Sequence, residues 1–161
     1  MKKTKTILIV LLAICTNMTF LSCSEDDSNG TSSSDTFIRF SIDGTDYALN
    51  DVVSATSLSL TLTGAKGDID SNEFISLGIF MPLVPVEGTY DVTDFFTEGD
   101  HKFTFNSEAL DVDFTFADSG TITISAIGEE YIEGTFSGVV TSNSDEAITI
   151  SNGSFRGFIV E

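Results

Sequence analysis

Apolar and polar residues alternate with a period of two over most of residues 36–161, which is the pattern of strands that bury one face. Two of these stretches place Phe114 and Phe136 on the apolar side. No segment of useful length shows the period of a helix, and 92–96 amounts to one helical turn at most. The pattern therefore predicts an all-β domain with both phenylalanines in its core.

Clusters of Gly, Asp, Asn and Ser separate the expected strands at intervals of about eight to twelve residues, as in sandwiches and barrels. About ten strands are expected, with longer loops at 64–72 and 82–101. Because the spacing is uneven, we predict an antiparallel β-sandwich, and a closed β-barrel is the alternative. The stretch 74–81 is apolar on both faces and is expected at the centre of a sheet. Asn152-Gly153 is typical of a type I′ hairpin turn.

The N-terminus has the organisation of a targeting segment. Three lysines among the first five residues precede an apolar run, 7–14, that is too short to span a bilayer. Ser22 and Cys23 then resemble the lipobox of bacterial prolipoproteins, in which a small residue precedes an obligatory Cys. The resemblance implies that residues 1–22 are a signal peptide and that Cys23 is lipidated, which attaches the protein to a membrane.

Residues 23–35 are polar and of low complexity, and they cannot bury enough apolar surface to fold. We interpret them as the lipidated Cys and a flexible tether to a single domain, 36–161. The acidic residues in 24–27 resemble the surface-export signal of Bacteroidetes lipoproteins. That resemblance implies the outer membrane and exposure at the cell surface.

A second resemblance rests on the segments 40–44 with Tyr47, 120–124, 132–136 and 148–155. Their strand alternation and turn glycines are similar to a signature of Bacteroidetes lipoproteins in families of unknown function. The similarity covers about a third of the mature chain. It implies the same fold and the same cellular location, and it implies no activity.

Charge and cysteine content restrict the partners. The chain has a formal net charge of −18; three of its seven basic residues lie before Cys23 and all 25 acidic residues lie after it, so the mature chain carries −21. Such a polyanion is repelled by nucleic acid, so no nucleic-acid partner is expected.

The two cysteines leave no pair for a disulfide in the mature chain. Cys15 is removed with the signal peptide and Cys23 is used by the anchor, so no disulfide is expected.

No residue set amounts to a catalytic or cofactor site, so we expect no enzyme activity and no cofactor. His101 is the only histidine, lies in a polar turn-like stretch and is expected to be exposed. One histidine without a thiol supports neither a catalytic triad nor a zinc site. Glu133 beside Tyr131 is a conceivable acid catalyst, but alternation places both on the solvent face, opposite Ile132.

Calcium is the one ion that the sequence brings forward. Asp68, Asp70, Asn72 and Glu73 place oxygen-bearing side chains close together, as in the first half of an EF-hand loop. The match then ends, because Glu73 stands where that loop needs Gly and Ile79 where it needs Glu. The alternatives are a weak calcium site and a solvated acidic turn.

Aromatic and apolar residues leave two further alternatives open. Tyr47, Tyr90 and Tyr131 are either packing residues or sugar platforms. The run 80–86 either packs over the end of the sandwich or forms an exposed patch. The sequence favours a non-enzymatic, surface-anchored domain that binds or spaces an unknown protein or glycan partner. The alternative is a glycan- or calcium-dependent recognition module for nutrient uptake or adhesion.

Overall fold

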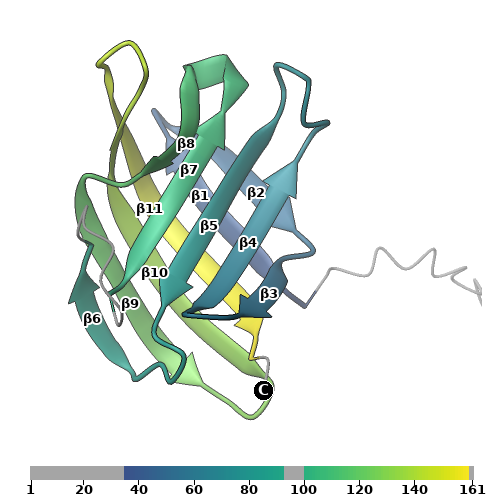
Figure 1. The fold of residues 1–161 in the computed structure, drawn as a ribbon, viewed down its shortest axis with the longest axis vertical. Coiled ribbons are helices and arrows are strands. Elements are labelled where there is room, and N and C mark those ends of the chain that lie inside the picture. Colours follow the sequence, from purple (N-terminus) through teal and green to yellow (C-terminus); the bar gives the residue numbers. More distant parts are fainter. Residues whose placement is uncertain (1–34, 93–99, 160–161) are drawn as a thin grey trace, which may run out of the picture. The chain divides into compact units, whose positions relative to one another are not determined.

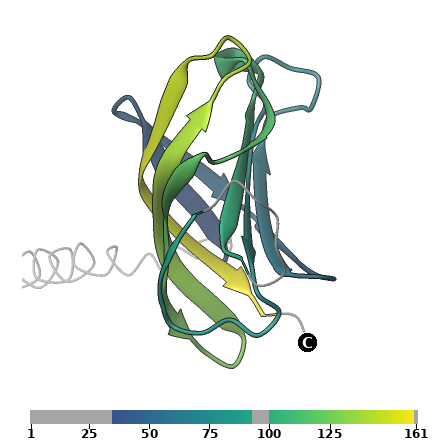
Figure 2. The same cartoon turned by 60° about the vertical axis from the view of Figure 1, so that its left-hand side comes forward.

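The computed structural model describes residues 35–92 and 100–159, and all of these fall in one compact unit, Ser32–Glu161. Two antiparallel sheets pack face to face in this unit (Figure 1, Figure 2). The sandwich is therefore confirmed, and the sheets do not close into the alternative barrel. Cys23 and nearly all of the tether lie outside the described residues. Within the two described ranges, no helix is long and apolar enough to cross a membrane.

The larger sheet has six strands in the order β2-β1-β11-β10-β9-β6. Its strands are β1 (Phe37–Ile42), β2 (Thr45–Asn50), β6 (Gly88–Asp91), β9 (Ser119–Ile127), β10 (Tyr131–Thr141) and β11 (Ala147–Phe158). The first strand of the chain therefore pairs with the last, so the sheet is completed only when both ends of the domain are present.

The smaller sheet has five strands in the order β3-β4-β5-β7-β8. Its elements are β3 (Val53–Thr56), β4 (Leu60–Lys66), β5 (Ile75–Met81), β7 (Lys102–Ser107), the short 3-10 turn η1 (Glu108–Leu110) and β8 (Val112–Phe116). As predicted for 74–81, β5 is central. The described residues contain eleven strands: β6 lies inside the predicted loop 82–101, and β4 extends into the predicted loop 64–72. The helical turn considered at 92–96 lies almost entirely outside the described residues.

The core lies between the two sheets and is rich in phenylalanine. Phe40 of the larger sheet meets Phe105 of the smaller one edge-on, with ring centroids 5.9 Å apart. Phe103 and Phe136 meet across the same interface at 5.5 Å. Ring pairs at such separations contribute about 0.5–1.5 kcal/mol beyond the area that they bury. The core position predicted for Phe136 is confirmed.

Glycines on the inner face of the larger sheet make room for these rings. A Cβ at Gly134 would lie 2.5 Å from the Phe155 ring, and one at Gly138 would lie 2.7 Å from the Phe103 ring. A Cβ at Gly153 would likewise lie 2.6 Å from the Phe136 ring. The interpretation of Gly134 and Gly153 as turn glycines is therefore wrong. They lie within strands, where a side chain would overlap with the phenylalanine ring packed against the glycine.

Asn152 and Gly153 do not form a hairpin turn, so this prediction is also wrong. They lie inside β11, which continues to Phe158. Asn152 has a positive φ of 53°, and the pairing of β11 slips by one residue against both neighbouring strands at this place. The two residues therefore form a β-bulge. Asn tolerates the left-handed backbone that a bulge requires, which is why Asn-Gly serves here as well as in a turn.

Phe114 is the clearest error among the predicted core residues, because its side chain is 64% exposed. Its φ of 46° and a slip in the pairing of β8 with β7 mark another irregularity of the sheet. The slip interrupts the period-two alternation, so Val112 faces the core while Phe114 does not. A single-residue irregularity of this kind leaves no signature in the apolar pattern.

Candidate functional site

The acidic loop between β4 and β5 holds the four calcium candidates. Asp68, Asp70, Asn72 and Glu73 are all exposed. The turn is closed by Ser71, whose backbone N–H and hydroxyl both donate to the carbonyl of Asp68, at 2.9 and 2.8 Å. In the part of the chain that the structure describes, no three His, Cys, Asp or Glu side chains are grouped as a metal site requires. Calcium binding at this loop stays a prediction.

The prediction that His101 is exposed is wrong, because this residue is only 6% exposed. Its ring stacks on Tyr90 of β6, with centroids 3.6 Å apart and planes nearly parallel. Burial lowers the pKa of His101, and the neighbouring Asp100 carboxylate opposes this effect. Nε2 is buried and has no hydrogen-bond partner among the described residues. The ring therefore serves packing, with its neutral form favoured.

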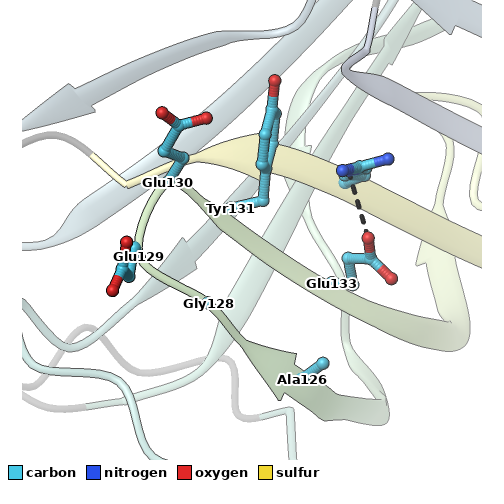
Figure 3. Close-up of a pocket in the computed structure, with 7 residues that line it drawn as sticks. Ala126, Gly128, Glu129, Glu130, Tyr131 and Glu133 are labelled. Atoms are coloured by element: carbon cyan, nitrogen blue, oxygen red, sulfur yellow. Dashed lines mark ion pairs between the residues drawn. The ribbon is translucent and has the colours of Figure 1, made fainter.

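Glu133 and Tyr131 lie on the solvent side of β10, as the alternation predicts. Glu133 Oε1 is 3.1 Å from Nε of Arg156, and this ion pair is half exposed. The guanidinium of Arg156 also lies 4.1 Å from the centre of the Tyr131 ring. Figure 3 shows the carboxylate of Glu133 turned toward this partner rather than toward a second free carboxylate. The pair is thus engaged in local structure.

The three tyrosines do not share one concavity. Tyr90 stacks on His101, and its hydroxyl donates to the carbonyl of Val86 at 2.9 Å. Tyr47 stacks on Phe40 with centroids 5.3 Å apart. Tyr131 is covered twice. Phe158 stacks on its ring with centroids 4.8 Å apart, and the guanidinium of Arg156 lies 4.1 Å from the ring centre. A sugar ring that stacked on Tyr131 would compete with these two groups.

Asp35, the first described residue, lies beside Tyr131. The phenol hydroxyl donates to the carboxylate of Asp35 at 3.4 Å. Partial burial and the carboxylates of Asp35 and Glu130 raise the pKa of Tyr131, while Arg156 acts in the opposite direction. The phenol therefore stays protonated and neutral near neutral pH.

The apolar run 80–86, expected either to pack over the end of the sandwich or to form an exposed patch, is not uniform. Met81 at the end of β5 is buried in the core, whereas the residues after it are more exposed. Leu83, Val84 and Val86 are exposed, and Val84 reaches 81%. They form the connection between β5 and β6, at the lower end of the molecule in Figure 1. The second alternative, an exposed patch, describes these residues correctly.

The outer face of the larger sheet, which points away from the core, carries a row of hydroxyl groups. We call Thr89, Thr123, Thr135 and Ser154 the hydroxyl row, because each pairs with the next across neighbouring strands. The row ends at Arg39, which pairs with Ser154. The hydroxyl oxygens of Thr89 and Thr123 are 2.9 Å apart. Since directly paired residues point to the same side of a sheet, the row and Arg39 together span five strands on one face.

Both arginines of the chain lie on this outer face. Arg156 pairs with Glu133 on one side and with Phe37 on the other. Arg39 lies 4.3 Å over the Phe37 ring. Each guanidinium therefore rests on an aromatic ring, which holds it in place and adds about 0.5–1 kcal/mol at an exposed position.

Two open hollows are each lined by one of these arginines. The first, of about 450 Å³, is drawn in Figure 3. It is lined by Glu129, Glu130, Tyr131, Glu133 and Arg156. The second, of about 420 Å³, lies where β2, β1 and β11 adjoin. Its polar lining residues are Arg39, Ser41, Asp46, Asn152 and Ser154, and the aromatic residues Phe40 and Tyr47 complete the lining. We call the second one the Arg39 hollow.

Sequence reasoning did not select the residues of the Arg39 hollow. Alternation places Arg39 outward, between two buried residues, and this signal was present. Asp46 lies on the next strand of the same hairpin, but Ser154 is paired with Arg39 across more than a hundred residues, and one sequence does not encode that pairing locally. The bulge at Asn152 was concealed by a motif that also fits a turn.

Comparison with known proteins adds no assignment. No protein-family model matches the chain, and no match was found among curated proteins or solved structures.

Proposed function

We propose that this protein is a lipid-anchored lipoprotein of the outer membrane whose β-sandwich is a non-enzymatic recognition module outside the cell. The proposed lipid anchor at the outer membrane is supported by residues 1–22, by Cys23 and by the polar segment that follows. A module on such a tether samples the space around its anchor and is not fixed against the membrane.

One observation carries the choice of a binding module over a spacer. Both arginines and two open hollows occupy the same outer face of the larger sheet. The mature chain keeps only four basic residues against 25 acidic ones, so two guanidinium groups on one face are a marked concentration. A spacer needs no such grouping, whereas recognition of a polar ligand does.

Absence of enzymatic activity is part of the proposal. A general base or nucleophile must lie within hydrogen-bonding reach of its partner, at about 2.6–3.2 Å. His101 stacks on Tyr90 away from both hollows, and Glu133 is engaged with Arg156. A calcium-dependent module, using the loop around Asp68 and Asp70, is the alternative.

Metabolic labelling with a fatty-acid analogue tests the anchor. We expect the wild-type protein to be labelled and Cys23→Ser to remain unlabelled, because Ser offers no thiol for acylation. Protease treatment of intact cells then tests exposure, and the domain should be digested without lysis. Equal labelling of the Cys23→Ser variant contradicts the anchor, and protection of the domain in intact cells contradicts its position at the surface.

A further inference from the structure

We propose that the Arg39 hollow binds a neutral saccharide through its hydroxyl groups. The inference rests on the proposed recognition function and names its ligand class. The polar groups that would contact the ligand come from three strands: Arg39 and Ser41 from β1, Asp46 from β2, and Asn152 and Ser154 from β11. Three separate strands thus converge on one hollow.

The bulge in β11 provides the first argument. An extra residue in a strand re-aims its side chains, and bulges occur frequently beside functional sites. Here the bulge lies at Asn152 and Gly153, and Asn152 lines the hollow. Its Nδ2 lies 3.5 Å from the Ser41 hydroxyl. A regular β11 would present one residue fewer at this position, so the bulge contributes an amide to the hollow.

The state of the two charged groups provides the second argument. Arg39 lies over Phe37 and has no ion pair with a carboxylate among the described residues. Asp46 accepts a hydrogen bond of 2.6 Å from Ser41 and likewise has no described cationic partner. A guanidinium and a carboxylate thus line one hollow without neutralising each other directly. Both keep hydrogen-bonding capacity for a ligand.

The balance of charge selects the ligand class. Arg39 supplies donors only, Asp46 supplies acceptors only, and Asn152 supplies both. Neighbouring sugar hydroxyls donate and accept, so they match this set without adding charge. An anionic ligand would meet the Asp46 carboxylate and a mature chain with a net charge of −21. A cationic ligand would meet Arg39.

The hydroxyl row favours an extended ligand over a single sugar. Ser154 belongs to both the hollow and the row, and the row continues across β10 and β9 to Thr89. Neighbouring strands are about 4.8 Å apart, so the row extends roughly 20 Å from Arg39. A linear oligosaccharide that starts in the hollow would therefore meet further hydroxyl groups on the same face.

The hollow beside Tyr131 is the weaker candidate for the same ligand. Its arginine is already engaged by Glu133 at 3.1 Å. Glu129 and Glu130 add negative charge without a described cationic partner. This contrast makes the hollow beside Tyr131 an internal reference, and saccharide binding should leave the signals of Tyr131 unaffected.

Titration followed by NMR tests the proposal. The mature chain, residues 23–161 with Cys23→Ser, is titrated with cellohexaose, xylohexaose and mannohexaose, and with hexagalacturonate as an acidic probe. We expect at least one neutral hexasaccharide to shift the amide signals of Arg39, Asp46 and Asn152. Open hollows of this size bind weakly, so a dissociation constant of about 0.1–10 mM is expected. Hexagalacturonate should bind less tightly.

Four variants identify the site. Arg39→Gln, Asp46→Asn and Asn152→Gly should each weaken binding by about tenfold, while circular dichroism shows that the fold is kept. Glycine at 152 tolerates the positive φ, so this variant removes the amide and keeps the bulge. Lys66→Gln is the matched control, because it removes an exposed positive charge from the other sheet and should bind like the wild type.

Three outcomes overturn the proposal. They are the absence of any shift with the three neutral probes at roughly 10 mM, tightest binding of hexagalacturonate, and equal weakening by Lys66→Gln. Fatty-acid labelling of Cys23 is read separately. A labelled protein that binds no saccharide refutes the ligand alone, whereas saccharide binding by an unlabelled wild-type protein refutes the anchor alone.

Discussion

Strand β10 presents two different surfaces from alternate residues. Toward the core it offers Gly134, which is covered by a ring of the neighbouring strand β11, and Phe136, which packs against a ring of the other sheet. Toward solvent it offers Glu133 and Thr135, which take part in an ion pair and in the hydroxyl row. The inner face of the larger sheet is thus organised by volume, and its outer face by hydrogen-bonding groups and charge.

The two faces should therefore respond differently to substitution. A buried site cannot collapse fully around a lost ring, nor expand around an added methyl group, so inner-face changes alter stability. Outer-face groups remain hydrated and contribute little to the free energy of unfolding. Substitutions that separate stability from ligand binding should accordingly divide along this alternation.

The largest effect is expected from removal of a core ring. Phe136→Ala should lower the free energy of unfolding by about 3–5 kcal/mol, because Phe136 packs against both Phe103 and Phe40. Phe114→Ala is the matched control and should cost less than about 1 kcal/mol, because that ring is 64% exposed. Urea denaturation measures both. Equal losses would mean that exposure does not distinguish these two rings.

An added methyl group tests the same face from the opposite direction. Gly138→Ala should cost about 1–3 kcal/mol, because the new Cβ would lie 2.4 Å from the Ser119 carbonyl and 2.7 Å from the Phe103 ring. Gly128→Ala is the control, since its nearest contact is 3.5 Å away. Thermal unfolding compares the two variants. A Gly138→Ala protein as stable as Gly128→Ala would contradict the close packing of the inner face.

Much of the inner face could be predicted from the sequence, because burial of one side of a strand produces period-two alternation locally. Phe136 and the sandwich were obtained in this way. Phe114 was missed because the slip of β8 breaks that period, and His101 because a polar residue in a polar stretch gives no sign of burial. Both errors arise where tertiary structure overrides a local pattern.

The outer face could be predicted only in part. Alternation correctly places Glu133 on the solvent side of β10. It does not show which residues of other strands lie beside Glu133, since register is set by contacts between distant segments. Arg39 and Ser154 are 115 positions apart in sequence and are paired in space. A binding face assembled across strands therefore becomes visible only in the folded chain.

Loss of an outer-face ion pair should have a smaller effect on stability. Arg156→Gln should change the free energy of unfolding by no more than about 1 kcal/mol, because Arg156 and Glu133 are both partly exposed. Chemical denaturation at low and high salt measures this change, and salt should reduce it further. A loss of about 3 kcal/mol would place the arginine in the same class as the core residues and would break the distinction between the two faces.

The smallest effect is expected from His101, which brings a titratable ring to the inner side of the edge strand β6 through its stack on Tyr90. Burial lowers its pKa below the 6.5 of an unperturbed imidazole, so the unfolded chain binds the proton more readily than the folded one. Stability contributed by the neutral ring is therefore present above pH 6.5 and is lost as pH falls from there toward the lowered value.

His101→Phe keeps an aromatic ring beside Tyr90 and removes the titration. Melting temperatures measured from pH 7.5 to 5.5 should fall more steeply for the wild type than for this variant, because carboxylate titrations are common to both proteins. Parallel curves would mean that the imidazole is protonated equally in both states and that its burial carries no electrostatic cost.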